Sequence, residues 1–275
     1  MVTGQKLMAQ TTNNIIQTPK ALSILVSLDG LSFCVLSFGK ISLLSEVSFE
    51  KQLNPIEVLE RLKKALSKEQ LISEHFEKVT LTISNELFTC VPEALFNKNN
   101  LTNYLKFSSK LLKTDFADVD ALPALQLHTV YIPFTNITNF IYDQFGAFTY
   151  RHSISVFAEA ILAMQKENSI AVNVTSQYFE LVVIQDNALK LANRFTYSSK
   201  EDFIYYILFT YEQLNLDREE DILYVAGLIE EGDDNYEMAF KYIRHIAFLE
   251  YSGYESDTSL ELQPHQHLLI RQALI

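Results

Sequence analysis

The chain has 275 residues, which is long enough for one large domain or two packed domains with a substantial core. Apolar residues make up 48% of it, a share far too high for a disordered chain. The net charge of −12 repels nucleic acid and anionic membrane surfaces at long range. We therefore expect a globular protein without a nucleic-acid partner.

The apolar runs are too short for membrane insertion. Each spans fewer than about ten residues, whereas a helix needs roughly 20 to cross a bilayer. Residues 1–21 are polar and lack the apolar core of a signal peptide, so we interpret them as a polar lead-in. These features predict a cytoplasmic location.

Residues 23–49, SILVSLDGLSFCVLSFGKISLLSEVSF, predict three short antiparallel strands. Apolar runs are interrupted first by Asp29-Gly30 and then by Gly39-Lys40. Such pairs are typical of hairpin turns, because glycine reaches positive φ at no steric cost. The expected strands lie near 24–29, 32–38 and 41–49.

A helix and a strand follow. Asn54-Pro55 opens the helix, since proline suits the first turn, and Ile56, Leu59, Leu62 and Leu66 fall on one helical face. Residues 78–84, KVTLTIS, alternate strictly and predict a strand. The connecting stretch predicts helices near 99–113, 136–145 and 154–165 and strands at 127–132 and 148–152.

The same order returns 146 positions later (169 − 23), from Ser169. Strands are expected near 169–175, 178–185 and 188–197, helices near 200–215 and 235–245, and further strands at 221–229 and 246–252, with Asp186-Asn187 as a turn. An internal duplication of a β-β-β-α-β-α unit follows, with a boundary near 155–168. We expect a first lobe at 22–154, a second lobe at 155–250 and a C-terminal tail at 251–275.

This repeated plan resembles the actin-like ATPase superfamily, which includes actin, sugar kinases, heat-shock chaperones and pilus-assembly proteins. The resemblance covers about residues 22–250. More narrowly, SNELFTCVPEALF at 84–96 and NFIYDQFGAFTYRHS at 139–153 are similar to a family of uncharacterised Bacteroidetes proteins with this fold. The resemblance implies an α/β fold of two actin-like, ribonuclease H-like lobes with a cleft between them, and it implies no activity.

In the superfamily the first turn of each lobe holds nucleotide phosphates, and a nearby aspartate orients the water ligands of magnesium. The first motif resembles I-D-L-G-T-T-N-S-C-V and falls on VSLDGLSFCV. Ser27 then takes the place of the aspartate and Asp29 that of the first glycine. Gly30 and Leu31 take the places of the two threonines.

The second motif resembles D-I-G-G-G-T-F-D and falls on NVTSQYFE. Asn173 replaces its aspartate and Glu180 its second acid, while Thr175, Ser176 and Gln177 replace the glycines. The offset of 146 also brings Ser27 onto Asn173 (27 + 146 = 173). We therefore expect these two residues to be equivalent in the two lobes.

The substitutions predict lost chemistry. Ser27 and Asn173 carry no charge, so magnesium would lack both of its usual anchors. Gln177 and Tyr178 are bulky where glycine and threonine belong, and they would crowd the phosphates. We expect a non-catalytic pseudoenzyme, without a metal site, that binds an unidentified protein partner as a scaffold.

A nucleotide-binding protein or ATPase with rearranged acids is the alternative. Asp29 follows Ser27 by two residues and could face the cleft, although a turn residue is the favoured interpretation. Glu180 could act as an acid, or it could point outward to solvent. If ATP and magnesium bind, the expected contacts are Ser27, Asp29, Gly30, Asn173, Thr175, Ser176, Glu180 and Gly227. A third hypothesis, a carbohydrate or metabolite kinase, needs a catalytic aspartate, and no residue can be assigned to that role.

Three further features have competing interpretations. Cys34 and Cys90 are too few for a disulfide framework, and we expect buried thiols. His265 and His267 lack a third metal ligand, which favours a solvated or partner-contacting tail. Residues 203–211, FIYYILFTY, are apolar on two helical faces, so the second face is either covered by a neighbouring helix or open to a partner.

Overall fold

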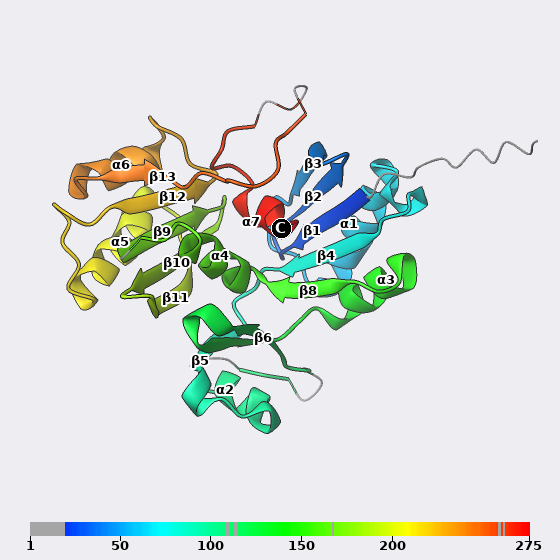
Figure 1. Cartoon of the computed structure of the whole chain (residues 1–275), viewed down its shortest axis with the longest axis horizontal. Helices are drawn as coiled ribbons and strands as arrows, with labels where there is room; N and C mark the ends of the chain where they lie inside the picture. The colour runs from blue at the N-terminus through cyan, green and yellow to red at the C-terminus, as the bar shows by residue number, and fades with distance from the viewer. Residues whose placement is uncertain (1–19, 108–109, 113–114, 167, 258–259, 261) are drawn as a thin grey trace, which may run out of the picture.

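The computed structural model describes residues 20–107, 110–112, 115–166, 168–257, 260 and 262–275, so almost all of the predicted lead-in at 1–21 lies outside the described residues. Two five-stranded sheets form its body, one in the order β3-β2-β1-β4-β8 and one in the order β11-β10-β9-β12-β13 (Figure 1). In each sheet three antiparallel strands come first and two parallel strands are added beside the first of them. The predicted α/β fold of two β-β-β-α-β-α lobes is confirmed.

The first sheet contains all the predicted strands, but its first strand begins four residues and ends three residues earlier than expected. It contains β1 (Lys20–Val26), β2 (Gly30–Ser37), β3 (Lys40–Ser48), β4 (Lys78–Ile83) and β8 (Thr149–His152). The turn between β2 and β3 is formed by Phe38 and Gly39, with φ of 54° and 73°, one residue earlier than predicted. The turn between β1 and β2 also comes one residue earlier than predicted, at Leu28-Asp29, because the Ser27 N–H bonds to the Gly30 carbonyl oxygen and Gly30, without a positive φ, already belongs to β2.

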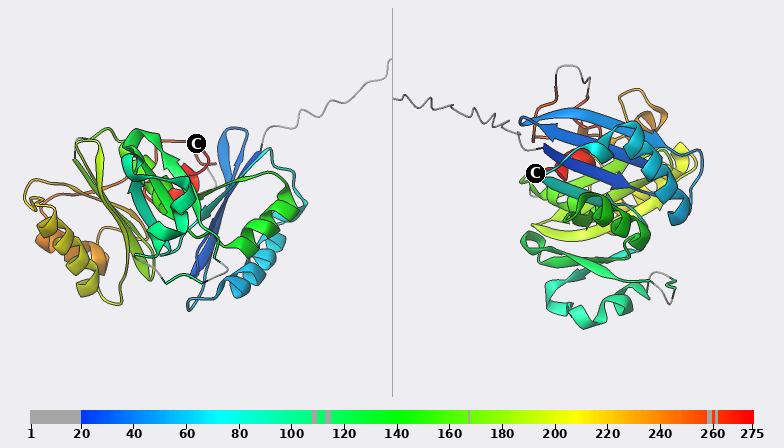
Figure 2. Two further views of the ribbon diagram at one scale, coloured as in Figure 1. Left: turned by 90° about the horizontal axis from the view of Figure 1, so that it is seen from below. Right: turned by 90° about the vertical axis from the view of Figure 1, so that its right-hand side faces the viewer.

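Two helices cover the outer face of the first sheet, α1 (Pro55–Lys68) and α3 (Thr135–Phe145) (Figure 2). The Asn54 side chain accepts the N–H groups of Ile56 and Glu57, and the Glu57 carboxylate accepts the Asn54 N–H, so α1 begins with a complete capping box. The buried face of α1 consists of Val58, Leu62, Ala65 and Leu66. Ile56, which was predicted on this face, is 73% exposed.

A small three-stranded sheet is inserted between β4 and α3, and the sequence predicted only one of its strands. Its order is β5-β7-β6, with β5 (Phe88–Pro92), β6 (Asp118–Leu122) and β7 (Leu127–Tyr131). The helix α2 (Leu101–Leu105) packs on it and is much shorter than the predicted helix at 99–113. The strands β5 and β6 have five residues each, and their apolar alternation is too brief to stand out.

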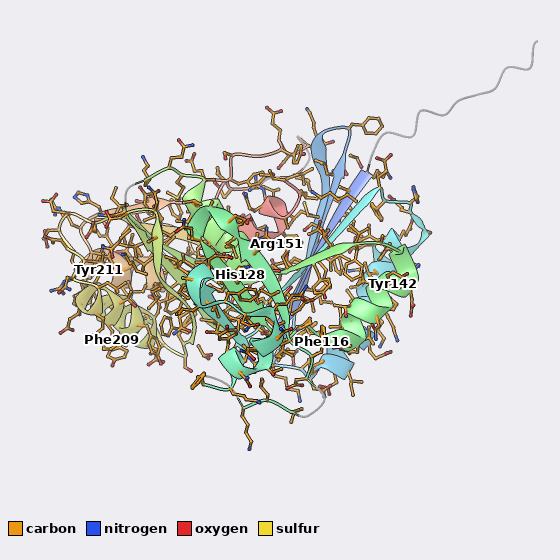
Figure 3. The ribbon with its side chains drawn as sticks, turned by 60° about the horizontal axis from the view of Figure 1, so that its bottom comes forward. Phe116, His128, Tyr142, Arg151, Phe209 and Tyr211 are labelled. Atoms are coloured by element: carbon orange, nitrogen blue, oxygen red, sulfur yellow. The ribbon has the colours of Figure 1, made fainter. Side chains whose placement is uncertain are left out.

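The second sheet repeats the topology of the first. It contains β9 (Asn168–Val174), β10 (Tyr178–Gln185), β11 (Ala188–Thr196), β12 (Leu223–Gly227) and β13 (Ile246–Phe248). The predicted turn at Asp186-Asn187 is confirmed, because both residues have positive φ, 53° and 58°. The helices α5 (Lys200–Gln213) and α6 (Asp234–Tyr242) lie on its outer face, and Figure 3 shows Phe209 and Tyr211 at that outer side.

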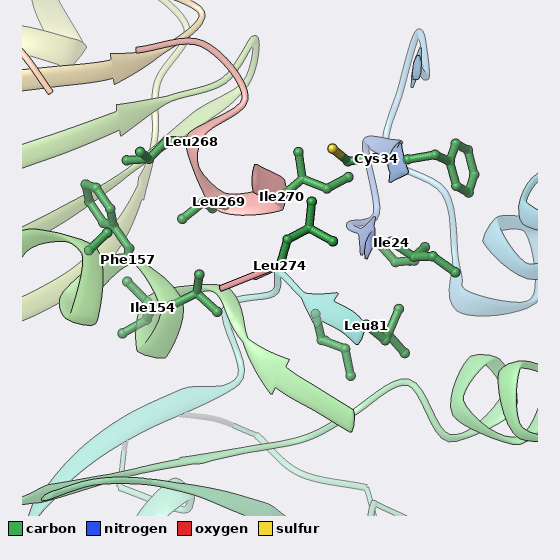
Figure 4. Close-up of a cluster of buried hydrophobic side chains, with 14 of the residues drawn as sticks. Ile24, Cys34, Leu81, Ile154, Phe157, Leu268, Leu269, Ile270 and Leu274 are labelled. Atoms are coloured by element: carbon green, nitrogen blue, oxygen red, sulfur yellow. The ribbon is translucent and has the colours of Figure 1, made fainter. Parts of the chain in front are cut away.

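The space between the two sheets is filled by α4 (Ser153–Leu162) and α7 (Leu268–Gln272) (Figures 1 and 4). Figure 4 shows Leu268 and Leu269 of α7 near Phe157 of α4, and Ile270 near Cys34 of β2. All five side chains are at most 4% exposed. The expectation of a solvated or partner-contacting tail is therefore wrong, because the end of the chain forms part of the central core.

Within the described part of the chain, each helix is too short or too polar to span a bilayer.

Candidate functional site

The first turns of the two lobes meet at a cavity of about 90 Å³ between the sheets. Its lining includes seven of the eight residues predicted from the motifs, namely Ser27, Asp29, Gly30, Asn173, Thr175, Ser176 and Gly227. The eighth, Glu180, is not among the lining residues. One wall is formed by the C-terminal segment, from His267 to Ile270.

In the first lobe, Ser27 and Asp29 interact with each other. Both are buried, at 3% and 6% exposure. The Ser27 hydroxyl lies 2.5 Å from Oδ1 of Asp29 and 3.0 Å from the carbonyl oxygen of Gly30, so its single proton has two acceptors within reach. Asp29 belongs to the turn and also lines the cavity, and one of its carboxylate oxygens already has a hydroxyl partner.

In the second lobe, the turn between β9 and β10 is closed by the same kind of bond. The Thr175 hydroxyl donates to the carbonyl oxygen of Tyr178 at 2.8 Å, and the Thr175 N–H donates to that oxygen at 2.9 Å. In the first lobe, the Ser27 N–H donates to the carbonyl oxygen of Gly30 at 3.0 Å, and the Ser27 hydroxyl oxygen lies at the same distance from that carbonyl oxygen. Ser27 is therefore the structural equivalent of Thr175.

This equivalence corrects the repeat offset. The first three strands of the two lobes begin 148 residues apart (168 − 20, 178 − 30 and 188 − 40), rather than the 146 predicted. Counting by 148, Asn173 corresponds to Leu25 and not to Ser27, and both Leu25 and Asn173 line the cavity. With either offset, the residues aligned with each other at this position, Leu25 or Ser27 in the first lobe and Asn173 or Thr175 in the second, are uncharged.

Glu180 is fully buried, so of the two alternatives left open by the sequence the outward solvated carboxylate is wrong. Its Oε1 accepts from the Ser153 hydroxyl and from the Ser84 hydroxyl, the latter at 3.3 Å. Its Oε2 accepts from the Asn173 amide at 3.3 Å. Burial raises the pKa of this carboxyl, while the hydrogen bond from Ser153 and the charge of Arg194 oppose that rise. Glu180 joins β4, α4 and β9 from the core.

Tyr178 and Arg194 form a second link between the lobes that the sequence analysis missed. The Tyr178 hydroxyl lies 3.0 Å from the hydroxyl of Ser84, at the end of β4. The Arg194 guanidinium stacks on the Tyr178 ring, 3.3 Å from its centroid, and its Nη1 donates to Ser84 at 3.3 Å. Arg194 lies directly opposite Glu180 across the β10–β11 strand pair. Knowledge of that register could therefore have placed Arg194 beside the buried end of β10.

Gly227 is the point where the C-terminal segment is held. Its φ of +86° suits glycine, and a Cβ here would lie 2.2 Å from the carbonyl oxygen of Val174. Its N–H donates to the carbonyl oxygen of His265 at 3.0 Å. The His265 ring lies 2.9 Å from the carbonyl oxygen of Ile229 and packs on Phe248, and burial lowers its pKa.

The two histidines of the tail have separate surroundings. His267 lies 3.4 Å from a carboxylate oxygen of Glu46 on β3, whereas His265 lies against the second lobe. Nowhere in the described ranges do three His, Cys, Asp or Glu side chains gather as they would around a metal ion. Cys34 and Cys90 are both free thiols.

The chain belongs to the protein family described as "Protein of unknown function (DUF3822)", whose family model matches residues 9–246. Among curated proteins, no sequence matches the chain.

Solved structures with a similar fold are distant in sequence. A Bacteroides thetaiotaomicron protein described as having an actin-like ATPase fold and unknown function is 18% identical, with a TM-score of 0.75 over 96% of this chain and 98% of that one. A PilM-PilN type IV pilus biogenesis complex gives 10% identity and a TM-score of 0.61, over 92% and 97%. The ethanolamine utilization protein EutJ from Carboxydothermus hydrogenoformans gives 9% and 0.51, over 93% and 88%. The chain therefore has an actin-like fold.

Proposed function

We propose that this member of a family of unknown function is a non-catalytic actin-like protein that acts as a protein-binding scaffold. The observation that carries the proposal is the C-terminal segment, which lies between the lobes and leaves a cavity of about 90 Å³. Pockets for small molecules usually measure about 300–1,000 Å³. Since α7 buries Leu268, Leu269 and Ile270 there, opening the site to a nucleotide would expose apolar core.

The chemistry of the cavity also supports a non-catalytic role. Magnesium prefers anionic oxygen ligands, and the aligned positions Leu25, Ser27, Asn173 and Thr175 supply none. The Asp29 carboxylate is engaged by Ser27, and Glu180 is enclosed by three donors away from the cavity lining. For either carboxylate to coordinate the magnesium of a bound triphosphate, its hydrogen bonds to these side chains would have to break.

A candidate surface for a partner lies on α5. Its inner face buries Phe203 and Ile207 against the second sheet, while Tyr205 and Phe209 on the other face are 60% and 47% exposed. The two exposed rings stack at 6.1 Å. This arrangement favours the open partner face over a helix covered on both sides, and solvent-exposed aromatic pairs are common anchors of protein interfaces. The pilus biogenesis complex of similar fold agrees with a protein partner.

The alternative function, an ATPase with rearranged acids, retains one supporting observation. Asp29 and Gly30 do line the cavity beside Gly227. This function requires α7 to leave the space between the lobes. A cytoplasmic location and the lobe boundary near 155–168 are further proposals of ours. The boundary falls largely on α4, which packs in the central core between the two sheets.

Titration calorimetry of the intact chain with ATP and ADP, with and without magnesium, tests the non-catalytic part. We expect no heat of binding at high micromolar nucleotide. Magnesium-dependent binding that disappears in Asp29→Ala would overturn the proposal in favour of the ATPase.

Affinity capture from the native cell tests the scaffold part. A protein that binds the intact chain should be lost with Tyr205→Ser/Phe209→Ser. It should be retained by Phe38→Ser, a control at a ring that is 76% exposed in the β2–β3 turn. Equal capture by all three proteins would move the partner site away from α5.

A further inference from the structure

A second and larger pocket, of about 450 Å³, opens where the three-stranded sheet joins the first lobe. Its walls come from the turn after β1, the link between β4 and β5, the link between β7 and α3, and residues 110, 112, 115 and 116. The strand β11 of the second lobe, with Arg194 and Thr196, completes the lining. It shares no lining residue with the cavity between the two turns. Its volume falls within the usual range of about 300–1,000 Å³ for small-molecule sites.

Most of the pocket is apolar, and part of its apolar wall is uncovered. Ile132 and Phe134 are buried at 7% and 8% exposure and form the inner wall. Phe116 and Leu112, on the same lining, are 61% and 68% exposed. Figure 3 shows Phe116 on the stretch between the three-stranded sheet and the helices of the first lobe. A ligand in the pocket would remove part of this apolar surface from water.

The polar group that distinguishes the pocket is Arg194. The Tyr178 ring holds its guanidinium flat, and Nη1 donates to Ser84. Among the described residues, no carboxylate lies within 4.0 Å of this guanidinium. A guanidinium carries five N–H donors in a fixed plane, so Arg194 keeps donors for an anionic ligand.

The other polar groups of the lining have different roles. Asn85 holds the wall together, because its amide donates to the carbonyl oxygen of Ile132 at 2.8 Å and accepts the Leu87 N–H at 2.9 Å. The Asp115 carboxylate accepts the N–H of Leu112 at 2.7 Å. Lys110 and Glu86 are exposed residues of opposite charge. Arg194 is therefore the pre-oriented charged group of the site.

We propose that this pocket binds a small molecule that carries a carboxylate on an apolar or aromatic body. The carboxylate pairs with Arg194, and the body packs on Phe116, Ile132 and Phe134. A planar guanidinium can bind a carboxylate through two parallel N–H···O bonds, which fixes the orientation of the ligand. Because Arg194 belongs to the second lobe and the apolar wall to the first, the ligand would join the two lobes.

Calorimetric titration of the intact chain with 4-phenylbutyrate and with octanoate tests the proposal. Their amides serve as uncharged controls, and acetate serves as a carboxylate without a body. We expect saturable binding of both long carboxylates and none of the amides or acetate. Absence of binding by both carboxylates, or equal binding of the amides, would overturn the proposal.

Variants locate the binding. Arg194→Gln should weaken the affinity about tenfold or more, which corresponds to about 1.4 kcal/mol. Since this change also removes the stack on Tyr178, Phe116→Ala is the second test, at a side chain that is 61% exposed. It should weaken binding several-fold, while Phe38→Ala, outside the pocket lining, should leave it unchanged. Wild-type affinity in both Arg194→Gln and Phe116→Ala would place the ligand elsewhere and contradict the proposal.

Discussion

The hydroxyl of Ser84, at the end of β4, lies 3.0 Å from the hydroxyl of Tyr178, the first residue of β10, and this contact joins the two lobes in the buried core. Ser84 also contacts Glu180 and Arg194, so one serine serves three groups of the other lobe. A buried network of this kind depends on every member keeping its partner.

We expect Ser84→Ala and Tyr178→Phe to be coupled. A typical hydrogen bond contributes about 0.5–1.5 kcal/mol, so a double-mutant cycle by urea unfolding should give a coupling free energy in this range. Tyr211→Phe is the matched control, because its hydroxyl bonds to the carbonyl oxygen of Asp221 within the second lobe. The effect of that change should add to the effect of Ser84→Ala. Additivity in both pairs would mean that the interlobe hydroxyl contact contributes no stability.

Gly227→Ala should destabilise the protein strongly. The new methyl group would lie 2.2 Å from the Val174 carbonyl oxygen, in a backbone conformation at φ +86° that alanine rarely adopts. Strain of this kind costs on the order of 1–3 kcal/mol for the backbone alone, and the clash adds to it. Gly232→Ala has a similar φ of +95° with no atom within 4 Å, so it should lose only the backbone part. Equal losses in urea unfolding would show that the contact with β9 is unimportant.

Glu180→Gln should change the pH dependence of stability. Burial raises the pKa of Glu180 in the folded state, so the folded chain binds more protons than the unfolded chain between the two pKa values. Its contribution to stability is complete below the unfolded pKa, about 4.3, and is lost as the pH rises through the folded value. The wild type should therefore lose more free energy of unfolding than Glu180→Gln as the pH rises from about 4.3 to the folded pKa, and above that pKa the difference between the two profiles should stay constant. Profiles that stay parallel across the whole pH range would contradict this account.

Cys34 should resist alkylation while α7 is in place. Burial raises the pKa of its thiol to about 12, and burial raises that of Cys90 to about 11. Because the thiolate is the reactive form, iodoacetamide should label Cys34 on the order of a thousand times, and Cys90 on the order of a hundred times, more slowly in the folded chain than in urea. Ile270→Ala, beside Cys34 (Figure 4), should accelerate labelling of Cys34 and leave Cys90 unchanged. Labelling of both cysteines at one common rate would indicate global unfolding instead of local release of α7.

The two faces of α5 should differ in their effect on folding. Phe203 is 0% exposed, and Phe203→Ala should cost about 3–5 kcal/mol. Phe209 is 47% exposed, and Phe209→Ala should change the free energy of unfolding by about 0.5 kcal/mol or less. Thermal and urea unfolding of the two variants provide the measurement. A large loss in Phe209→Ala would argue that this ring stabilises the fold and is not reserved for a partner.

Local patterns were sufficient for the lobes. The strand β10 covers the predicted residues 178–185, and the Asp186-Asn187 turn has the expected positive φ values, because alternation and turn preferences are properties of neighbouring residues. The offset of the repeat was wrong by two residues. It was obtained by aligning residue types, whereas the equivalence of Ser27 and Thr175 is visible only in the backbone hydrogen bonds of the two turns. The short strands β5 and β6 were missed for lack of a long enough alternation.

Local periodicity and turn residues were enough to predict the fold class and the antiparallel three-stranded meander that opens each sheet, because both depend on neighbouring residues. Three features depend on contacts between distant parts of the chain: the burial of Glu180 between the lobes, the stacking of Arg194 on Tyr178, and the filling of the cleft by the C-terminal segment. The last result could not be read from residues 251–275, because their apolar side chains acquire a partner only where β2 and α4, far away in the chain, leave apolar surface uncovered.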